Sequence, residues 1–227
     1  MRRLALDTSS LACTVALKVD DKLFERHEEQ AREHTRLLMP MIRSSLEAAG
    51  ISLADLDAIV LGNGPGSFIG LRIAASVAQG LAHGAGLTII PVSSLAAIAA
   101  EVFDRSDASQ VAVAQDAHMN EVYLGLYERG DDDLPVLLSG ERLQGQGIIE
   151  ELSGSDAKFV FAGQGWQRYP GLAAANKAGF AAESDVLFPR AAYLLALAEQ
   201  LPALEPKDLQ PAYMRQKVAE KPSPKDT

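Results

Sequence analysis

Residues 62–72, of sequence GNGPGSFIGLR, have the composition of a ligand-binding loop. They follow the apolar run 58–61, which is typical of a buried strand, and they open a helix of small residues that we expect to reach Ala85. Glycines at alternate positions let the backbone adopt positive φ and leave N–H groups uncovered, and Ser67 is a good N-cap for the helix. Such a loop could bind an anion such as a phosphate.

The spacing excludes two well-defined nucleotide loops. A Walker A loop needs Lys and then Ser or Thr where this chain has Leu71 and Arg72. A dinucleotide fingerprint is one residue shorter than the spacing of Gly64, Gly66 and Gly70, and it follows a first strand, whereas this loop follows the fourth strand-like segment. The loop is therefore either a phosphate site of another kind or a tight turn packed closely on its neighbours.

A second polar turn, Asp7-Thr8-Ser9, follows the strand-like run 4–6. Its carboxylate could hold a metal or a water, and its hydroxyl and amide groups could donate to a phosphate. The same residue types also form turns simply by bonding to their own backbone. With Gly64 and Gly66, these three residues make up the candidate phosphate-binding set.

A search for catalytic and metal-binding patterns finds little else. Two histidines on one helix face must be spaced i and i+4 to share a metal, but Leu38 stands four residues after His34. The other histidines, His27, His83 and His118, are isolated, and the chain has no Gly-x-Ser-x-Gly nucleophile elbow. We therefore predict no catalytic residue and no metal site.

The composition is that of a globular protein, with 48% apolar and 22% charged residues. A net charge of −9 repels phosphate backbones, so the chain alone is a poor candidate for tight binding of DNA or RNA. The single Cys13 cannot form an internal disulfide, which fits a reducing cytoplasm. No secretory signal opens the sequence, and its longest apolar stretch, residues 84–100, is too short to span a bilayer. We expect a cytoplasmic protein without membrane contact.

The order of predicted elements is repeated along the chain. The first half reads as strands 4–6, 12–17 and 23–29, helix 33–49, strand 58–61, a helix after the glycine loop, strand 87–90 and helix 94–103. The second half reads as strands 111–114, 121–128 and 136–138, a weak helix 146–152, strand 158–161 and helix 191–201. This order predicts an α/β protein of two tandem lobes, residues 1–104 and 105–216, with a flexible tail at 217–227.

Several stretches in order along nearly the whole chain together resemble the TsaB (YeaZ) family of bacteria. They read LALDTS at 4–9, HTRLLMP at 34–40, GPGSFIGLR at 64–72, DA and EVY within 116–123, and PAYMR at 211–215. The first strand and the glycine loop are also shared with the wider actin, Hsp70 and sugar-kinase fold (ASKHA). The resemblance implies two lobes of that type, each a mixed sheet with helices. One residue departs from the family pattern, because Ile69 stands where the loop usually has Thr.

The resemblance implies an inactive paralogue of the enzyme TsaD, which transfers a threonylcarbamoyl group to N6 of adenosine 37 in tRNAs that read codons starting with A (the t6A modification). TsaD holds its metal with a His-x-x-x-His pair, and Leu38 breaks that pair here. The family members are non-catalytic scaffolds that pair with TsaD through the first two helices, and the ATPase TsaE joins them. The resemblance thus implies that the complex uses ATP, that tRNA binds only through the complex, and that the chain alone forms a homodimer.

The helix 33–49 has more apolar positions than one core-facing stripe needs, and it precedes the helix of small residues. We therefore expect a partner interface on these two helices, although each apolar side chain taken singly could equally be core. The expected interface residues are Leu37, Leu38, Met41, Ile42, Ser67, Phe68, Leu71, Arg72 and Ala75. The alternative is an enzyme that acts alone, either an ATP-dependent transferase or a metallopeptidase, built on the turn at Asp7 and the glycine loop.

Overall fold

The structure is a computed structural model that describes residues 1–30, 32–153 and 158–214. It contains two mixed β-sheets. The first sheet has the order β3-β2-β1-β4-β5. Its strands are β1 (Arg2–Asp7), β2 (Cys13–Val19), β3 (Lys22–Glu28), β4 (Ala58–Gly62) and β5 (Thr88–Val92). The first three form an antiparallel meander, and β4 and β5 run parallel to β1. This confirms the predicted strand meander and the mixed sheet.

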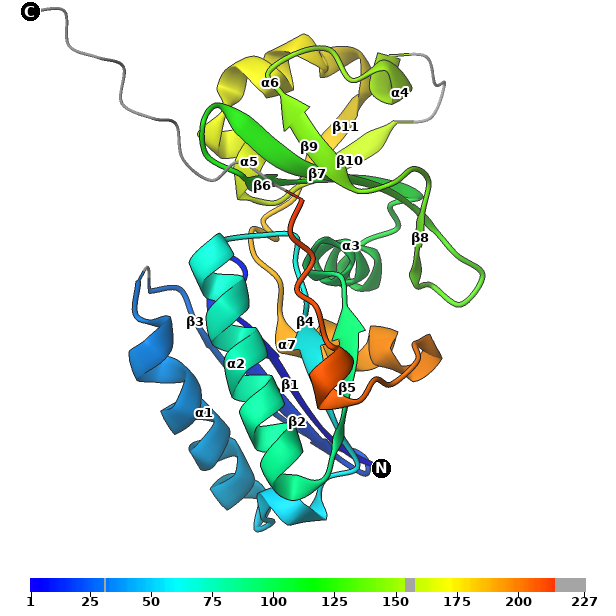
Figure 1. The fold of residues 1–227 in the computed structure, drawn as a ribbon. Helices are drawn as coiled ribbons and strands as arrows, with labels where there is room; N and C mark the ends of the chain where they lie inside the picture. Colours follow the sequence, from blue (N-terminus) through cyan, green and yellow to red (C-terminus); the bar gives the residue numbers. More distant parts are fainter. Residues whose placement is uncertain (31, 154–157, 215–227) are drawn as a thin grey trace, which may run out of the picture.

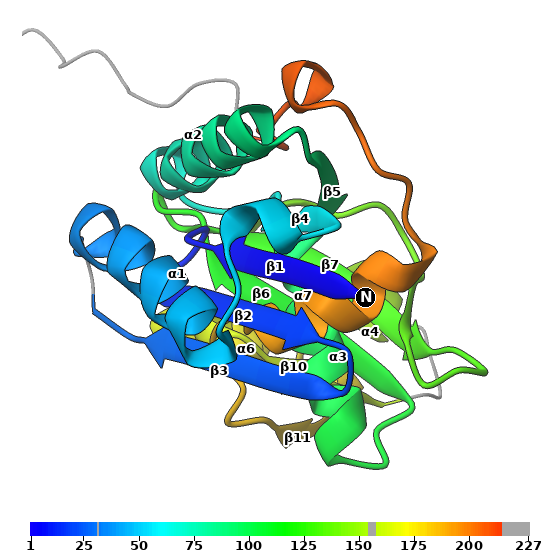
Figure 2. The same cartoon turned by 90° about the horizontal axis from the view of Figure 1, so that it is seen from below.

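Alternate residues of the first sheet enter two different cores. Leu4 and Leu6 of β1 face α1 (His34–Ala49) and α2 (Phe68–Ala85), which lie side by side over one face of the sheet (Figures 1 and 2). Ala5, between them, faces α7 (Ala191–Leu197) on the opposite face. Side chains that alternate along the strand are thus buried on both faces of the sheet, as expected of a central strand between two helical layers.

The second sheet has the order β11-β10-β6-β7-β8, and β9 also pairs with β7. Its strands are β6 (Gln110–Asp116), β7 (Glu121–Arg129), β8 (Pro135–Leu137), β9 (Arg142–Gly145), β10 (Phe159–Ala162) and β11 (Phe180–Glu183). One face packs on α3 (Ser94–Arg105), which lies between the two sheets (Figure 1). The other face packs on the short helices α4 (Glu150–Ser153), α5 (Gln164–Arg168) and α6 (Pro170–Ala175). The α/β class with two lobes, each a mixed sheet with helices, is therefore confirmed.

The C-terminal part of the chain returns to the first lobe. After α7 it passes through the 3₁₀ turns Ala198–Gln200 and Pro206–Asp208, and Leu204 pairs with Ile89 of β5. Gln79 of α2 donates to the carbonyl of Pro206 (2.8 Å). Farther on, Ala212 N donates to Asn63 O (3.2 Å) at the start of the glycine loop. The lobe boundaries at 104 and 216 remain a prediction, and the tail predicted at 217–227 lies outside the described residues.

Several sequence-based boundaries are corrected. The weak helix expected at 146–152 is the single turn α4, and the helix expected at 191–201 ends at Leu197 and tightens to 3₁₀. Elements as short as β9, β11, α5 and α6 were not predicted, since four to six residues carry almost no periodicity. The sequence also suggests that Pro40 kinks the helix or splits off its first turn, but α1 runs from His34 to Ala49 with Pro40 inside it. Among the described residues, no helix is long and apolar enough to cross a membrane.

Candidate functional site

The polar turn after β1 and the glycine loop after β4 lie against each other, as parallel neighbouring strands require. Ser67 N donates to Ser9 O (2.7 Å), and the Thr8 hydroxyl donates to Gly70 O (2.7 Å). The five residues of the candidate phosphate-binding set, Asp7, Thr8, Ser9, Gly64 and Gly66, are all buried. The structure therefore brings the set together, but the turn and the glycine loop bond to each other.

Three glycines permit this close approach. A Cβ at Gly62 would lie 1.9 Å from the carboxylate of Asp7, one at Gly66 would lie 2.3 Å from Ser9 O, and one at Gly70 would lie 1.9 Å from Thr8 O. No side chain fits at these distances, so the packing of the loop on the turn itself demands glycine. Ser67 caps α2 by accepting from Gly70 N (3.3 Å), as predicted.

Asp7 is the buried centre of this contact. Its carboxylate accepts from Ser9 N (2.5 Å) and from the Ser94 hydroxyl at the start of α3 (2.6 Å), and the Ser94 oxygen in turn accepts from Gly64 N (3.1 Å). Burial raises the pKa of Asp7 to about 6, against the hydrogen bonds from Ser94 and Ser9, which lower the pKa. Both carboxylate oxygens are thus used to join β1, the glycine loop and α3.

The raised pKa predicts a pH-dependent stability. Because the folded chain binds this proton more tightly than the unfolded chain, the contribution of Asp7 is fully present below about pH 4 and is lost as the pH rises through about 6. The loss is on the order of 3 kcal/mol. Urea denaturation measures the unfolding free energies of wild type and Asp7→Asn. As the pH rises between these values, we expect the wild type to lose stability relative to the variant. A difference that stays constant with pH would contradict the buried, protonatable Asp7.

The described residues give no support to a metal site. Nowhere in residues 1–30, 32–153 and 158–214 do three His, Cys, Asp or Glu side chains gather closely enough to hold an ion. His34 opens α1, and Leu38, one turn later, is only 1% exposed within the first core. Two cavities in the described part of the chain lie at β11, away from the turn at Asp7.

The nine residues expected at a partner interface divide into two groups. Five are buried inside the chain, where they pack on the first sheet or on its neighbouring loop: Leu38, Met41, Ile42, Leu71 and Ala75. The other four, Leu37, Ser67, Phe68 and Arg72, are partly or fully exposed. The inward stripe of an amphipathic helix and an interface stripe look alike in sequence, and only the burial of each side chain separates them.

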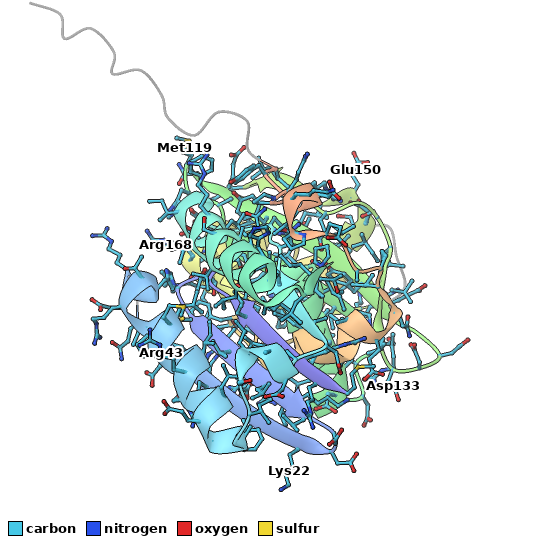
Figure 3. The ribbon with its side chains drawn as sticks, turned by 60° about the horizontal axis from the view of Figure 1, so that its bottom comes forward. Lys22, Arg43, Met119, Asp133, Glu150 and Arg168 are labelled. Atoms are coloured by element: carbon cyan, nitrogen blue, oxygen red, sulfur yellow. The ribbon has the colours of Figure 1, made fainter. Side chains whose placement is uncertain are left out.

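The exposed face of α2 is rich in small residues. Ser76, Gly80 and Gly84, spaced by four residues, are exposed there, as are Ile69 (70% exposed), Arg72 and His83. A Cβ at Gly80 or Gly84 would meet nothing within 4 Å, so neither glycine is required by the packing of this chain. The outer side of α1 is instead charged, with Arg36, Arg43 and Glu47 exposed (Arg43 is labelled in Figure 3).

One further cluster was not predicted as a contact. The Arg72 guanidinium lies 3.5 Å from the centre of the Phe68 ring and donates to the Tyr213 hydroxyl (3.2 Å). The Phe68 and Tyr213 rings are 5.2 Å apart. Tyr213 comes from the C-terminal segment, 141 residues after Arg72, so no local pattern could have joined them. The cluster fixes the C-terminal segment on the first turn of α2.

The protein has a two-lobed α/β fold of the actin, Hsp70 and sugar-kinase type. In it, the polar turn after β1 packs on the glycine loop after β4. A family model described as TsaD, tRNA N6-adenosine threonylcarbamoyltransferase, matches residues 26–221. The chain is 37% identical to TsaB of Haemophilus influenzae, over 97% of this chain and 96% of that protein. It is 36% identical to TsaB of Escherichia coli, over 99% of each chain.

Solved structures agree with this assignment. YeaZ from Pseudomonas aeruginosa superposes with a TM-score of 0.82 at 33% identity, covering 93% of this chain and 99% of that one. A second Pseudomonas aeruginosa structure, described as similar to the peptidase YeaZ, gives a TM-score of 0.84 at 34% identity, covering 94% and 99%. The chain therefore carries a TsaD-like domain and belongs to the TsaB (YeaZ) family.

Proposed function

We propose that this chain is a non-catalytic subunit needed for threonylcarbamoyl transfer to N6 of adenosine 37 in tRNAs that read codons starting with A. It binds and activates a TsaD-like transferase, and a TsaE-like ATPase joins the pair. Support for the pathway comes from the relatives, which are named tRNA threonylcarbamoyladenosine biosynthesis protein TsaB. The ATP is used by the complex, and tRNA is bound only through the complex, in agreement with the net charge of −9.

The observation that carries the scaffold role is the exposed face of α2, formed by Ile69, Ser76, Gly80 and Gly84. Glycine in the middle of a helix costs about 1 kcal/mol relative to alanine. Gly80 incurs this cost, and Gly84 in the last turn incurs part of it, although no neighbour among the described residues requires a glycine at either position. Small residues spaced by four along a helix let a second helix approach closely, so a helix of the partner, or of a second copy, explains them.

The candidate ligand residues support a structural role in place of a catalytic one. The carboxylate of Asp7 is fully buried and bonded to Ser9 and Ser94, and the Thr8 hydroxyl is bonded to Gly70. A phosphate could reach these groups only by displacing the glycine loop. In this proposal the partner interface consists of the outer side of α2, including the partly exposed Phe68 and the exposed Arg72, with the partly exposed Leu37 of α1.

The proposal is tested by reconstitution. The chain, its cognate TsaD-like and TsaE-like proteins, ATP, the threonylcarbamoyl donor and unmodified tRNA are combined, and modified adenosine is measured by mass spectrometry. We expect modification only when the chain is present, and we expect Asp7→Asn to support it once circular dichroism shows that this variant is folded. Peptide cleavage or ATP turnover by the isolated chain, abolished in Asp7→Asn, would establish the enzyme alternative instead.

A further inference from the structure

The strand β11 forms one edge of the second sheet, and its surface differs from the edges of the first sheet. The edge strand β3 carries charged side chains at Lys22, Glu25, Arg26 and Glu28, and the edge strand β5 is covered where Leu204 pairs with Ile89. Charges and coverage are the usual protection against unwanted strand pairing. Among the described residues, β11 pairs only with β10, and its four exposed residues carry one charge, at Glu183, and one large apolar side chain, Phe180, which is 39% exposed.

The backbone of β11 directs hydrogen-bonding groups to this free edge. Phe161 of β10 is the partner of Glu183, and Phe161 O accepts from Ser184 N (2.8 Å). In a parallel pair this pattern turns the N–H and C=O of Glu183 away from β10. Ala181 is the extra residue of a bulge, because Phe159 and Val160 oppose Phe180 and Ala182.

A cavity lies on each face of the sheet at this edge. The first, of about 290 Å³, is lined by Phe161, Trp166 and Phe180 among others, and we name it the aromatic pocket. The second, of about 340 Å³, is lined by Val160, Ala182 and Asp185 among others, and we name it the acidic pocket. Phe161 packs in the core under α5 and α6, whereas Val160 packs in the core under α3, so the pockets open on opposite faces. Glu183 borders both.

The charges around the acidic pocket favour a cation. Arg105 is the basic residue of its lining, and it is already paired with Asp185 (2.7 Å) and Glu101 (3.0 Å). Among the described residues, Glu183 has no cationic group within 4.0 Å. The net charge of Arg105, Asp185, Glu101 and Glu183 is therefore negative, like the net charge of the whole chain.

We propose that β11 binds an extended segment of a partner protein, which adds as a further strand to the second sheet. Successive side chains of a strand point to opposite faces, so the segment places a bulky apolar side chain in the aromatic pocket and the next side chain, a basic one, in the acidic pocket. Main-chain hydrogen bonds to Glu183 hold the segment in register. This surface lies in the other lobe from α1 and α2, as Figures 1 and 2 show.

The proposal is tested with synthetic peptides and the full chain. The probes are capped octapeptides that alternate Phe with Lys, Phe with Glu, or Ser with Lys, and a Phe/Lys peptide that is N-methylated at every amide. Trp166 is the one tryptophan of the chain and lines the aromatic pocket, so its fluorescence reports occupancy. We expect the Phe/Lys peptide to bind, the Phe/Glu and Ser/Lys peptides to bind at least tenfold more weakly, and the N-methylated peptide not to bind.

Protein variants locate the site. Phe180→Ser should weaken binding at least tenfold, whereas Leu137→Ser, which replaces a similarly exposed apolar residue on the edge strand β8, should leave it unchanged. The proposal is overturned if the Phe/Lys peptide leaves the Trp166 fluorescence unchanged, if Phe180→Ser binds like wild type, or if N-methylation has no effect.

Discussion

Gly80→Arg is expected to fold at least as stably as wild type and to lose the TsaD-like partner. The site is an exposed position inside α2 with no atom within 4 Å of a new Cβ, and arginine is a better helix former than glycine by up to about 1 kcal/mol. In the complex, the same side chain occupies the space that the partner helix needs. We expect the affinity to fall roughly 100-fold or more, equivalent to about 3 kcal/mol. Urea denaturation and calorimetric titration with the partner measure the two effects.

Gly140→Arg is the matched control for this variant. Gly140 is also exposed, and a Cβ there also meets nothing within 4 Å, but it lies in the second lobe before β9. The control should bind the partner like wild type. If Gly80→Arg bound equally well, the two exposed glycines of α2 would need another explanation and the proposed interface would be wrong.

Gly70→Ala is expected to destabilise the chain by about 3 kcal/mol or more. The added methyl group would lie 1.9 Å from the backbone oxygen of Thr8, and it would also disturb the hydrogen bond from the Thr8 hydroxyl to Gly70 O. A backbone atom cannot move aside as a flexible side chain can, so β1 and α2 would be forced apart. Thermal and urea denaturation measure the loss.

A glycine-to-alanine substitution elsewhere on α2 should increase the stability of the chain instead of lowering it. Gly84→Ala adds a methyl group in the last turn of α2, where no neighbour lies within 4 Å, and it should stabilise the helix by up to about 1 kcal/mol. Equal effects of the two substitutions on stability would contradict the packing role.

Most elements of the fold could be predicted from the sequence. The strand meander, the strand before the glycine loop and the helices α1 to α3 have clear periodicity, capping residues and turn signals, and each was found in place. Between residues 145 and 190, β10 was predicted, whereas α5, α6 and β11 are too short to show periodicity. Their positions are set by contacts across the lobe, such as Trp166 stacked on Phe161 and donating to Ala112 O (2.9 Å).

The candidate site was only half accessible to sequence reasoning. The candidate phosphate-binding set grouped Asp7 with Gly64 and Gly66 of the glycine loop, but the parallel pairing of β1 with β4 that brings them together was not predicted. That the glycines serve mutual packing could not be read from composition, because a phosphate loop and a tight backbone contact require the same residue. Likewise the apolar pattern of α1 identified Leu38 and Ile42 without showing that they face inward, where each is 1% exposed.

The most direct test of the account is light scattering after size exclusion, with the chain alone and then mixed with its cognate TsaD-like transferase. The account predicts a homodimer that is replaced by a one-to-one complex, because both states use the same face of α2, and Gly80→Arg should prevent both. A chain that remains unchanged by the transferase, with or without the TsaE-like ATPase and ATP, would contradict the scaffold role.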